Sequence, residues 1–197
     1  MPRKLTPRGE ERRAQLISYA TGRFAADGYH PTSVADIVDG LGVGKGVFYW
    51  YFSSKEELFV EILRTAQRDL RRTQLRAITD EPDPVRRLEL GIRAGVLWMA
   101  THSDHRRLFE FARMDTTFAD AVLAGQKVLV GDAVAHLQQA IDDGRIPDRD
   151  AEALGWGILG ITNVMTRVYI DGRGEAPEVV ADLVVDFCMH GIAGARD

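Results

Sequence analysis

Five aromatic residues follow one another from position 48, in the order Phe-Tyr-Trp-Tyr-Phe. Successive side chains of a helix are rotated by about 100°, so a helix cannot direct all five toward one hydrophobic core. Helical rotation places Phe48 and Tyr51 on one side, with Phe52 following them, and it places Tyr49 and Trp50 on the opposite side. We therefore predict that the first three pack as a small core and that the other two face a partner.

The rest of the chain has the residue spacing of helices. Apolar residues recur three and four positions apart, and glycine, proline and capping residues separate the segments. Neither a convincing strand pattern nor an internal repeat is present in the sequence. The expected helices cover residues 8–27, 32–41, 44–51, 55–79, 84–102, 105–114, 117–143, 149–170 and 177–193. The predicted fold is all-α, with about nine helices.

The composition is that of a soluble globular protein. The 197 residues are enough to bury a core, and the hydrophobic and charged fractions are 45% and 27%. No apolar run approaches the ~18 residues that span a bilayer, and the basic N-terminus is not followed by the apolar segment of a secretory signal. The single cysteine, Cys188, excludes an internal disulfide and is expected to be a small buried apolar side chain. These features favour a cytoplasmic protein without a membrane partner.

The net charge of −4 is unevenly distributed along the chain. Basic residues exceed acidic ones by two in residues 1–56, whereas acidic residues exceed basic ones by six in residues 57–197. A mildly basic N-terminal segment on an acidic body is compatible with a small module that binds a polyanion.

Two of the expected helices are separated only by Gly42-Val43, which predicts a helix-turn-helix. In this motif the second helix enters the major groove of DNA and the first helix crosses the backbone. Gly44 and Gly46 in the second helix each cost about 1 kcal/mol relative to alanine. Because they lack a Cβ, they allow the backbone to approach phosphates or base edges closely.

The outward side of the second helix carries groups that DNA can bind. Lys45 supplies positive charge, the Tyr49 hydroxyl can contact a phosphate, and Trp50 can lie against a sugar or a thymine methyl. Lys55, in the first turn of the next helix, is unfavourable against that helix's dipole, and a bound phosphate would remove the conflict. The surrounding segment Ser53-Ser54-Lys55-Glu56-Glu57 carries a doubled capping-box signal.

The segment PTSVADIVDGLGVGKGVFYWYFSSKEEL, residues 31–58, resembles the DNA-binding domain of the TetR family of transcriptional regulators. It departs from that family's usual pattern at Gly44, where serine is common, and at Val47, often threonine. The resemblance implies that Thr32 and Ser33 approach a phosphate and that Lys55 contacts the DNA backbone. The predicted DNA-binding residues are Thr32, Ser33, Gly44, Lys45, Gly46, Tyr49, Trp50 and Lys55.

The resemblance implies a helix-turn-helix domain over residues 1–54 and a helical effector-binding and dimerisation domain over residues 55–197. Members of the family are typically homodimers that repress genes until a small molecule releases them from a palindromic operator. We expect the dimer to form through the helices at about 149–170 and 177–193. Gly155, Gly157 and Gly160 leave the first of these helices without side chains at three positions, which suits close packing against another helix. The candidate seam residues are Leu154, Ile158, Ile161 and Met165 on one helix and Val180, Leu183 or Val184, Phe187 and Gly191 on the other.

The middle helices supply candidates for an effector pocket. A site built from them would favour an apolar or aromatic molecule, although aromatic and methionine side chains at helical spacing also fit a plain core. Polar residues in apolar helices could orient the ligand. The candidates are Trp98, His102, Phe109, Phe111, Arg113, Met114, Phe118, Trp156, Asn163, Met165 and Tyr169. His102 and His105 lack a carboxylate and a third ligand in register, so we expect neither a metal nor another cofactor.

The leading hypothesis is a ligand-responsive, sequence-specific DNA-binding repressor. One alternative is a helical enzyme or small-molecule-binding protein with an incidental helix-turn-helix. No nucleophile–base arrangement, paired carboxylates or phosphate loop is recognisable, so we expect no enzymatic activity. Another alternative is a nonspecific architectural DNA-binding protein, but a sequence pI of about 5.8 disfavours the many phosphate contacts that it needs.

Overall fold

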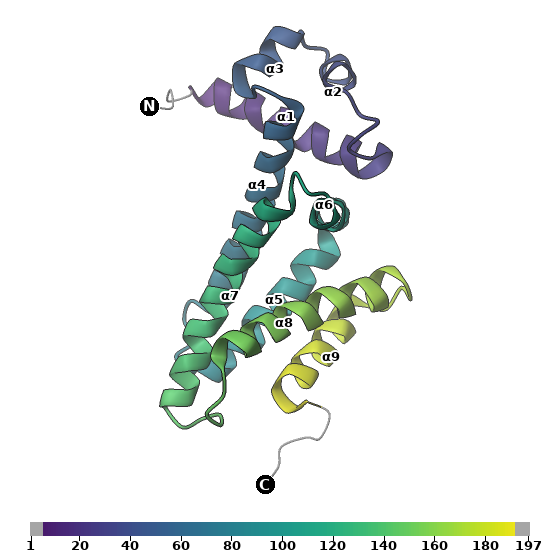
Figure 1. Cartoon of the computed structure of the whole chain (residues 1–197). Helices are drawn as coiled ribbons and strands as arrows, with labels where there is room; N and C mark the ends of the chain where they lie inside the picture. Colours follow the sequence, from purple (N-terminus) through teal and green to yellow (C-terminus); the bar gives the residue numbers. More distant parts are fainter. Residues whose placement is uncertain (1–5, 192–197) are drawn as a thin grey trace. The chain divides into compact units, whose positions relative to one another are not determined.

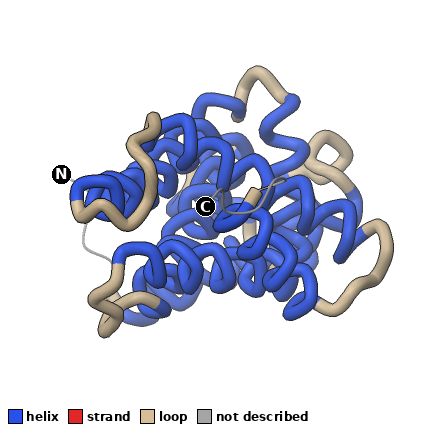
Figure 2. The backbone as a smooth tube through the Cα atoms, turned by 90° about the horizontal axis from the view of Figure 1, so that it is seen from below, coloured by secondary structure: helices blue, strands red, loops and turns tan. Residues whose placement is uncertain are grey.

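The computed structural model describes residues 6–191, and within this range the chain is helical without a strand (Figure 2). The prediction of an all-α fold is therefore confirmed for the described residues. The helices are α1 Pro7–Asp27, α2 Val34–Gly40, α3 Lys45–Tyr51, α4 Lys55–Ala77, α5 Pro84–Thr101, α6 Ser103–Met114, α7 Ala119–Asp142, α8 Ala151–Met165, η1 Thr166–Asp171 and α9 Pro177–His190.

The last part of the chain differs from the predicted helices in two places. The helix expected at 149–170 is α-helical only to Met165 and continues as η1, a six-residue π-helical segment. The helix expected at 177–193 ends at His190 with Gly191 at a positive φ of 66°, and residues 192 and 193 lie outside the described range. Periodicity does not distinguish a π-helical turn from an α-helical one over so few residues.

The helices form two compact units. Unit 1 contains residues 1–66 and 104–122, and unit 2 contains residues 67–103 and 123–197. Unit 1 therefore extends beyond the expected domain boundary at residue 54, because it includes the first half of α4, almost all of α6 and the start of α7.

A cluster of aromatic rings fills the core of unit 1. The Tyr29 ring centroid lies 4.7 Å from that of Phe59 and 4.9 Å from that of Phe118, and Phe59 and Phe118 are 4.6 Å apart. Phe24 and Phe111 extend the cluster. These rings are why α6 and the segment after it belong to the same unit as α1.

Two glycines shape the helix-turn-helix, in which α2 packs on α1 and is joined to α3 by a short turn (Figure 1). Gly42 in that turn has a φ of +64°, a conformation that favours glycine. Gly40, the last residue of α2, lies against Tyr19 of α1, and a Cβ built at Gly40 would be 1.7 Å from the Tyr19 hydroxyl oxygen. A side chain at position 40 would therefore have to displace the Tyr19 ring from its place against α2.

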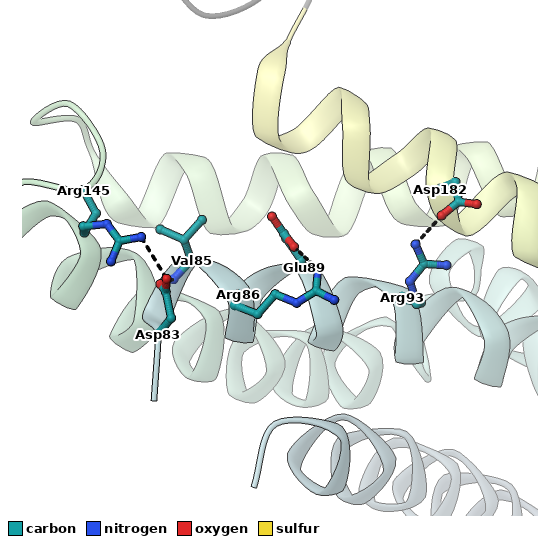
Figure 3. A network of polar contacts seen from close by, with 7 residues as sticks. All are labelled: Asp83, Val85, Arg86, Glu89, Arg93, Arg145 and Asp182. Atoms are coloured by element: carbon teal, nitrogen blue, oxygen red, sulfur yellow. Dashed lines mark hydrogen bonds and ion pairs between the residues drawn. The ribbon is translucent and has the colours of Figure 1, made fainter. Parts of the chain in front are cut away.

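Unit 2 is organised around α5. This helix packs against α9, and Ile92 and Val96 of α5 share a core with Val180 and Val184 of α9. Arg86 of α5 pairs with Glu89 of the same helix, and Arg93 of α5 pairs with Asp182 of α9 (Figure 3). Arg145 pairs with Asp83, the N-cap of α5.

We expect Phe118→Ala to lower the free energy of unfolding by about 3–5 kcal/mol, because Phe118 is 1% exposed and its removal leaves a cavity among the rings. Val128→Ala is the control, since Val128 is half exposed and should change stability by less than about 0.5 kcal/mol. Urea unfolding followed by circular dichroism measures both variants. Equal effects of the two substitutions would contradict the assignment of Phe118 to the core.

Candidate nucleic-acid interface

Helix α3 divides the aromatic run as predicted. Phe48 and Phe52 are 0% and 2% exposed, and Tyr51 is half-buried against the same core. Tyr49 and Trp50 are 56% and 63% exposed. The prediction of two interleaved sets is confirmed, and the outward set leaves two large aromatic surfaces in solvent.

The glycines of α3 are not needed by the protein's own packing. Gly44 is the N-cap with φ −77°, and Cβ atoms built at Gly44 and Gly46 would meet nothing within 4 Å. The absence of side chains at these two positions leaves the surface beside the exposed Lys45 open to an approaching molecule.

The start of α2 has a complete capping box. The Ser33 hydroxyl oxygen accepts a hydrogen bond from the Asp36 N–H at 3.2 Å, and the Asp36 carboxylate accepts bonds from both the Ser33 N–H and its hydroxyl at 2.7 Å. These bonds from Ser33 hold the pKa of Asp36 below its usual range. Ser33 is the N-cap of α2 and remains exposed. It is therefore accessible to a phosphate at the helix N-terminus, as the prediction requires.

Thr32 requires a correction. Its side chain is 2% exposed and its hydroxyl donates to the Gly28 carbonyl oxygen at 2.8 Å. The expected side-chain contact between Thr32 and a phosphate is therefore excluded in this conformation. The hydroxyl instead secures the loop between α1 and α2.

Lys55 is hydrogen-bonded within the protein. Its Nζ donates to the carbonyl oxygens of Tyr29 and Thr32 at 2.9 Å each and of His30 at 3.5 Å. The same Nζ lies 4.3 Å from the centroid of the Tyr29 ring. In this conformation carbonyl oxygens of the protein compensate the lysine at the start of α4. These bonds give Lys55 a positioning role, and its contact with the DNA backbone stays a prediction.

Tyr29 and the start of α4 are joined by a second contact. The Tyr29 hydroxyl donates to Glu56 Oε1 at 3.0 Å, and burial together with this carboxylate raises the pKa of Tyr29 well above its usual value. The structure shows which serine and which glutamate form the cap in this region. Ser54 Oγ accepts a hydrogen bond from the Glu57 N–H, and the Glu57 carboxylate accepts hydrogen bonds from the N–H and the hydroxyl of Ser53. Glu57 is thus the glutamate that pairs with Ser53, whereas the Glu56 carboxylate is hydrogen-bonded by its own N–H, by Ser54 and by Tyr29.

The predicted effector residues are spread over both units. Phe109, Phe111 and Phe118 belong to the core of unit 1, and Arg113 and Met114 are exposed. Trp98 is buried, donates to Asp69 and stacks on His102. Trp156 donates to Glu152 of its own helix, and Met165 and Tyr169 pack on the core between α5 and α9. The candidates are thus divided between the two units, and an effector site built from them stays a prediction.

Unit 2 instead contains a cavity of about 100 Å³ between α4, α5, α7 and α8. Asn163 is the predicted effector residue that lines it; the other candidates do not. Most lining side chains are apolar, and the polar lining residues are Gln74, Arg87, Asp132, His136, Thr162 and Asn163. The available sequence signal was the presence of Asp132 and His136 in the otherwise apolar stretch 128–137 of α7, together with Gly91 and Gly95 one turn apart in α5.

The predicted seam residues divide between the core of unit 2 and its surface. Leu154, Ile158, Ile161 and Met165 pack into the core, Val180 and Val184 are buried, and Gly155 lies against Val130 and Val134. Leu183 and Phe187 are each 38% exposed. Together with Val164, Val168 and Val179 they form an exposed apolar set on α8, η1 and α9, which we call the α8–α9 surface and whose members are 37–56% exposed. Dimerisation through these helices stays a prediction.

Cys188 is half-buried beside the core of unit 2, and burial raises the pKa of its thiol to about 11. Among residues 6–191 no three His, Cys, Asp or Glu side chains are grouped as metal ligands. Within the same range, no helix combines the length and apolar character of a membrane span.

Comparisons with known proteins give a consistent family. The family profile described as "Bacterial regulatory proteins, tetR family" matches residues 16–62. The HTH-type transcriptional regulator AcrR of Shigella flexneri is 28% identical over 70% of this chain and 62% of its own length. The HTH-type transcriptional repressor KstR2 of Mycobacterium tuberculosis is 45% identical over 27% of this chain and 26% of its own length. The chain thus spans less than two thirds of either relative.

The fold likeness extends over almost the whole chain. The structure of the fatty acid degradation regulator FadR from Bacillus halodurans superposes with a TM-score of 0.86 at 16% identity, covering 98% of this chain and 100% of that one. At this identity the match concerns the fold alone.

We expect Lys55→Ala to lower the free energy of unfolding by about 1–3 kcal/mol, because three carbonyl oxygens lose a charged donor. Lys45→Ala removes the same side chain from an exposed position and should cost less than about 0.5 kcal/mol. Urea unfolding measures the difference. If Lys55→Ala is as neutral as Lys45→Ala, the positioning role of Lys55 is wrong.

Proposed function

We propose that this chain, which belongs to the TetR family of bacterial regulatory proteins, is a transcriptional regulator that binds double-stranded DNA through α3. One observation carries the proposal: the second helix of the helix-turn-helix buries Phe48 while it exposes Tyr49 and Trp50. Two adjacent large aromatic side chains that are each more than half exposed are typical of a surface that contacts another molecule.

In the proposed complex α3 lies in the major groove. Lys45 neutralises a phosphate, the Tyr49 hydroxyl binds a second phosphate, and Trp50 contacts a sugar or a thymine methyl. Gly44 and Gly46 allow close approach, and Ser33 binds a phosphate at the start of α2. Lys55 acts indirectly, because it holds the loop from which α2 begins.

We further propose that the protein acts as a homodimeric repressor in the cytoplasm and has no enzymatic activity. A dimer formed through the α8–α9 surface would bury Val179, Leu183 and Phe187, and its two-fold symmetry would match a palindromic operator. A small molecule bound in the cavity of unit 2 would release the operator.

The DNA contact is tested with a duplex recovered by selection from random sequence. Lys45→Ala should weaken binding and reduce the slope of log affinity against log salt concentration by about one unit, because one phosphate contact is lost. Lys127→Ala, an equally exposed lysine on α7, is the matched control and should leave both unchanged. Fluorescence anisotropy across a salt series measures the slope, and an unchanged slope for Lys45→Ala would remove it from the interface.

The dimer is tested with Leu183→Asp. An aspartate in the centre of the α8–α9 surface would have to be desolvated on association, so we expect the variant to sediment as a folded monomer at micromolar concentration. Val128→Asp, on an exposed part of α7, should remain dimeric. A dimer that persists in Leu183→Asp would place the dimer interface elsewhere.

A further inference from the structure

The cavity of unit 2 is elongated along α5. Its lining on this helix extends from Arg87 to Met99, a distance of about 18 Å at ~1.5 Å per residue. Apolar side chains such as Leu88, Ile92 and Ile158 cover most of this length. A ligand that fills the cavity therefore needs an extended apolar body.

Two polar groups in the lining are compensated by the protein itself. Gln74 Nε2 donates to the Gly91 carbonyl oxygen at 3.1 Å. Asp132 accepts two hydrogen bonds from Arg71, from Nε at 2.6 Å and from Nη2 at 2.9 Å. This bidentate pair neutralises the charge of Asp132, so the carboxylate is not a site for a cationic ligand.

Arg87 lacks such compensation. Its Nε donates to the backbone carbonyl of Glu81, and it forms no ion pair with a carboxylate of residues 6–191. Arg86 and Arg93 on the same helix, by contrast, each reach a carboxylate, as Figure 3 shows. Of the three arginines on α5, the one that lines the cavity thus finds no counter-ion among the residues that the structure describes.

His136 lies near the same end of the cavity. Desolvation and then the positive charge of Arg87 lower the pKa of His136, and Asp132 opposes this effect. The ring is therefore neutral at neutral pH and offers a hydrogen bond rather than a second charge. Thr162 and Asn163, on α8, are neutral, so they can donate hydrogen bonds to an anion but cannot neutralise its charge.

We propose that the cavity binds an amphipathic acid, with its apolar body along α5 and its anionic head against Arg87 and beside His136. The proposal rests on the proposed effector role of unit 2 and names the chemical class of that effector. A carboxylate would give Arg87 the charge-assisted partner that residues 6–191 do not supply. A neutral molecule of the same shape would cover the Arg87 guanidinium without giving it an anionic partner.

Isothermal titration calorimetry on the full chain without DNA tests this proposal. The probes are decanoic, cinnamic, naphthoic and abietic acids, each paired with its methyl ester, so that the apolar body stays nearly constant within a pair. At least one acid should bind about tenfold or more tightly than its ester, the expected value of a hydrogen-bonded charge. Arg87→Gln should abolish this preference, and Arg87→Lys should retain part of it because the charge remains.

Arg86→Gln is the matched control, since it removes the same charge one residue away, from a side chain that pairs with Glu89 and does not line the cavity. It should keep the preference for the acid. Esters that bind as tightly as their acids, a preference that survives Arg87→Gln, or no binding of any acid at millimolar concentration would each overturn the proposal.

Each acid that binds is then added to the complex with the selected duplex. An acid that binds but leaves DNA affinity unchanged would support the ligand class while contradicting the effector role. DNA binding that fails in the absence of any acid would contradict the proposed function without affecting the calorimetric result.

Discussion

The ammonium group of Lys55 joins the first turn of α4 to the loop between α1 and α2. Three carbonyl oxygens of that loop accept its hydrogen bonds, and the Tyr29 ring lies beneath it. Tyr29 in turn packs on Phe59 and Phe118 and donates to Glu56. The contacts of Lys55 and Tyr29 therefore hold the loop that precedes α2 against the core. This fixes the position of Ser33, whose capping box begins α2.

The outward face of α3 depends on that inner framework. Phe48 and Phe52 hold the helix against its support, and the 100° rotation per residue then directs Tyr49 and Trp50 outward. Small residues on either side of Lys45 leave this face unobstructed. The arrangement gives an exposed, weakly charged aromatic surface on a rigid element, which suits the proposed recognition of a particular DNA sequence better than nonspecific binding to many phosphates.

The sequence predicted the secondary structure and the two-sided character of α3 because both follow from local rules. Turn glycines, the Ser33 capping box and apolar spacing each act within a few residues. The positioning role of Lys55 was not predicted because its acceptors are 23 to 26 positions away and are backbone atoms, which leave no mark on the side-chain pattern. The sequence also does not show which of the effector and seam candidates are covered by the protein itself, since both apolar faces of α8 look alike in sequence and only packing on α5 and α7 decides which one is buried.

The central claim is that DNA binds to the outward face of α3. Hydrogen–deuterium exchange of the protein, with and without the selected duplex, tests it most directly. We predict that backbone amides of residues 44–51 gain protection in the complex, together with those at the start of α2. Protection confined to other surfaces, with exchange in residues 44–51 unchanged, would contradict the account.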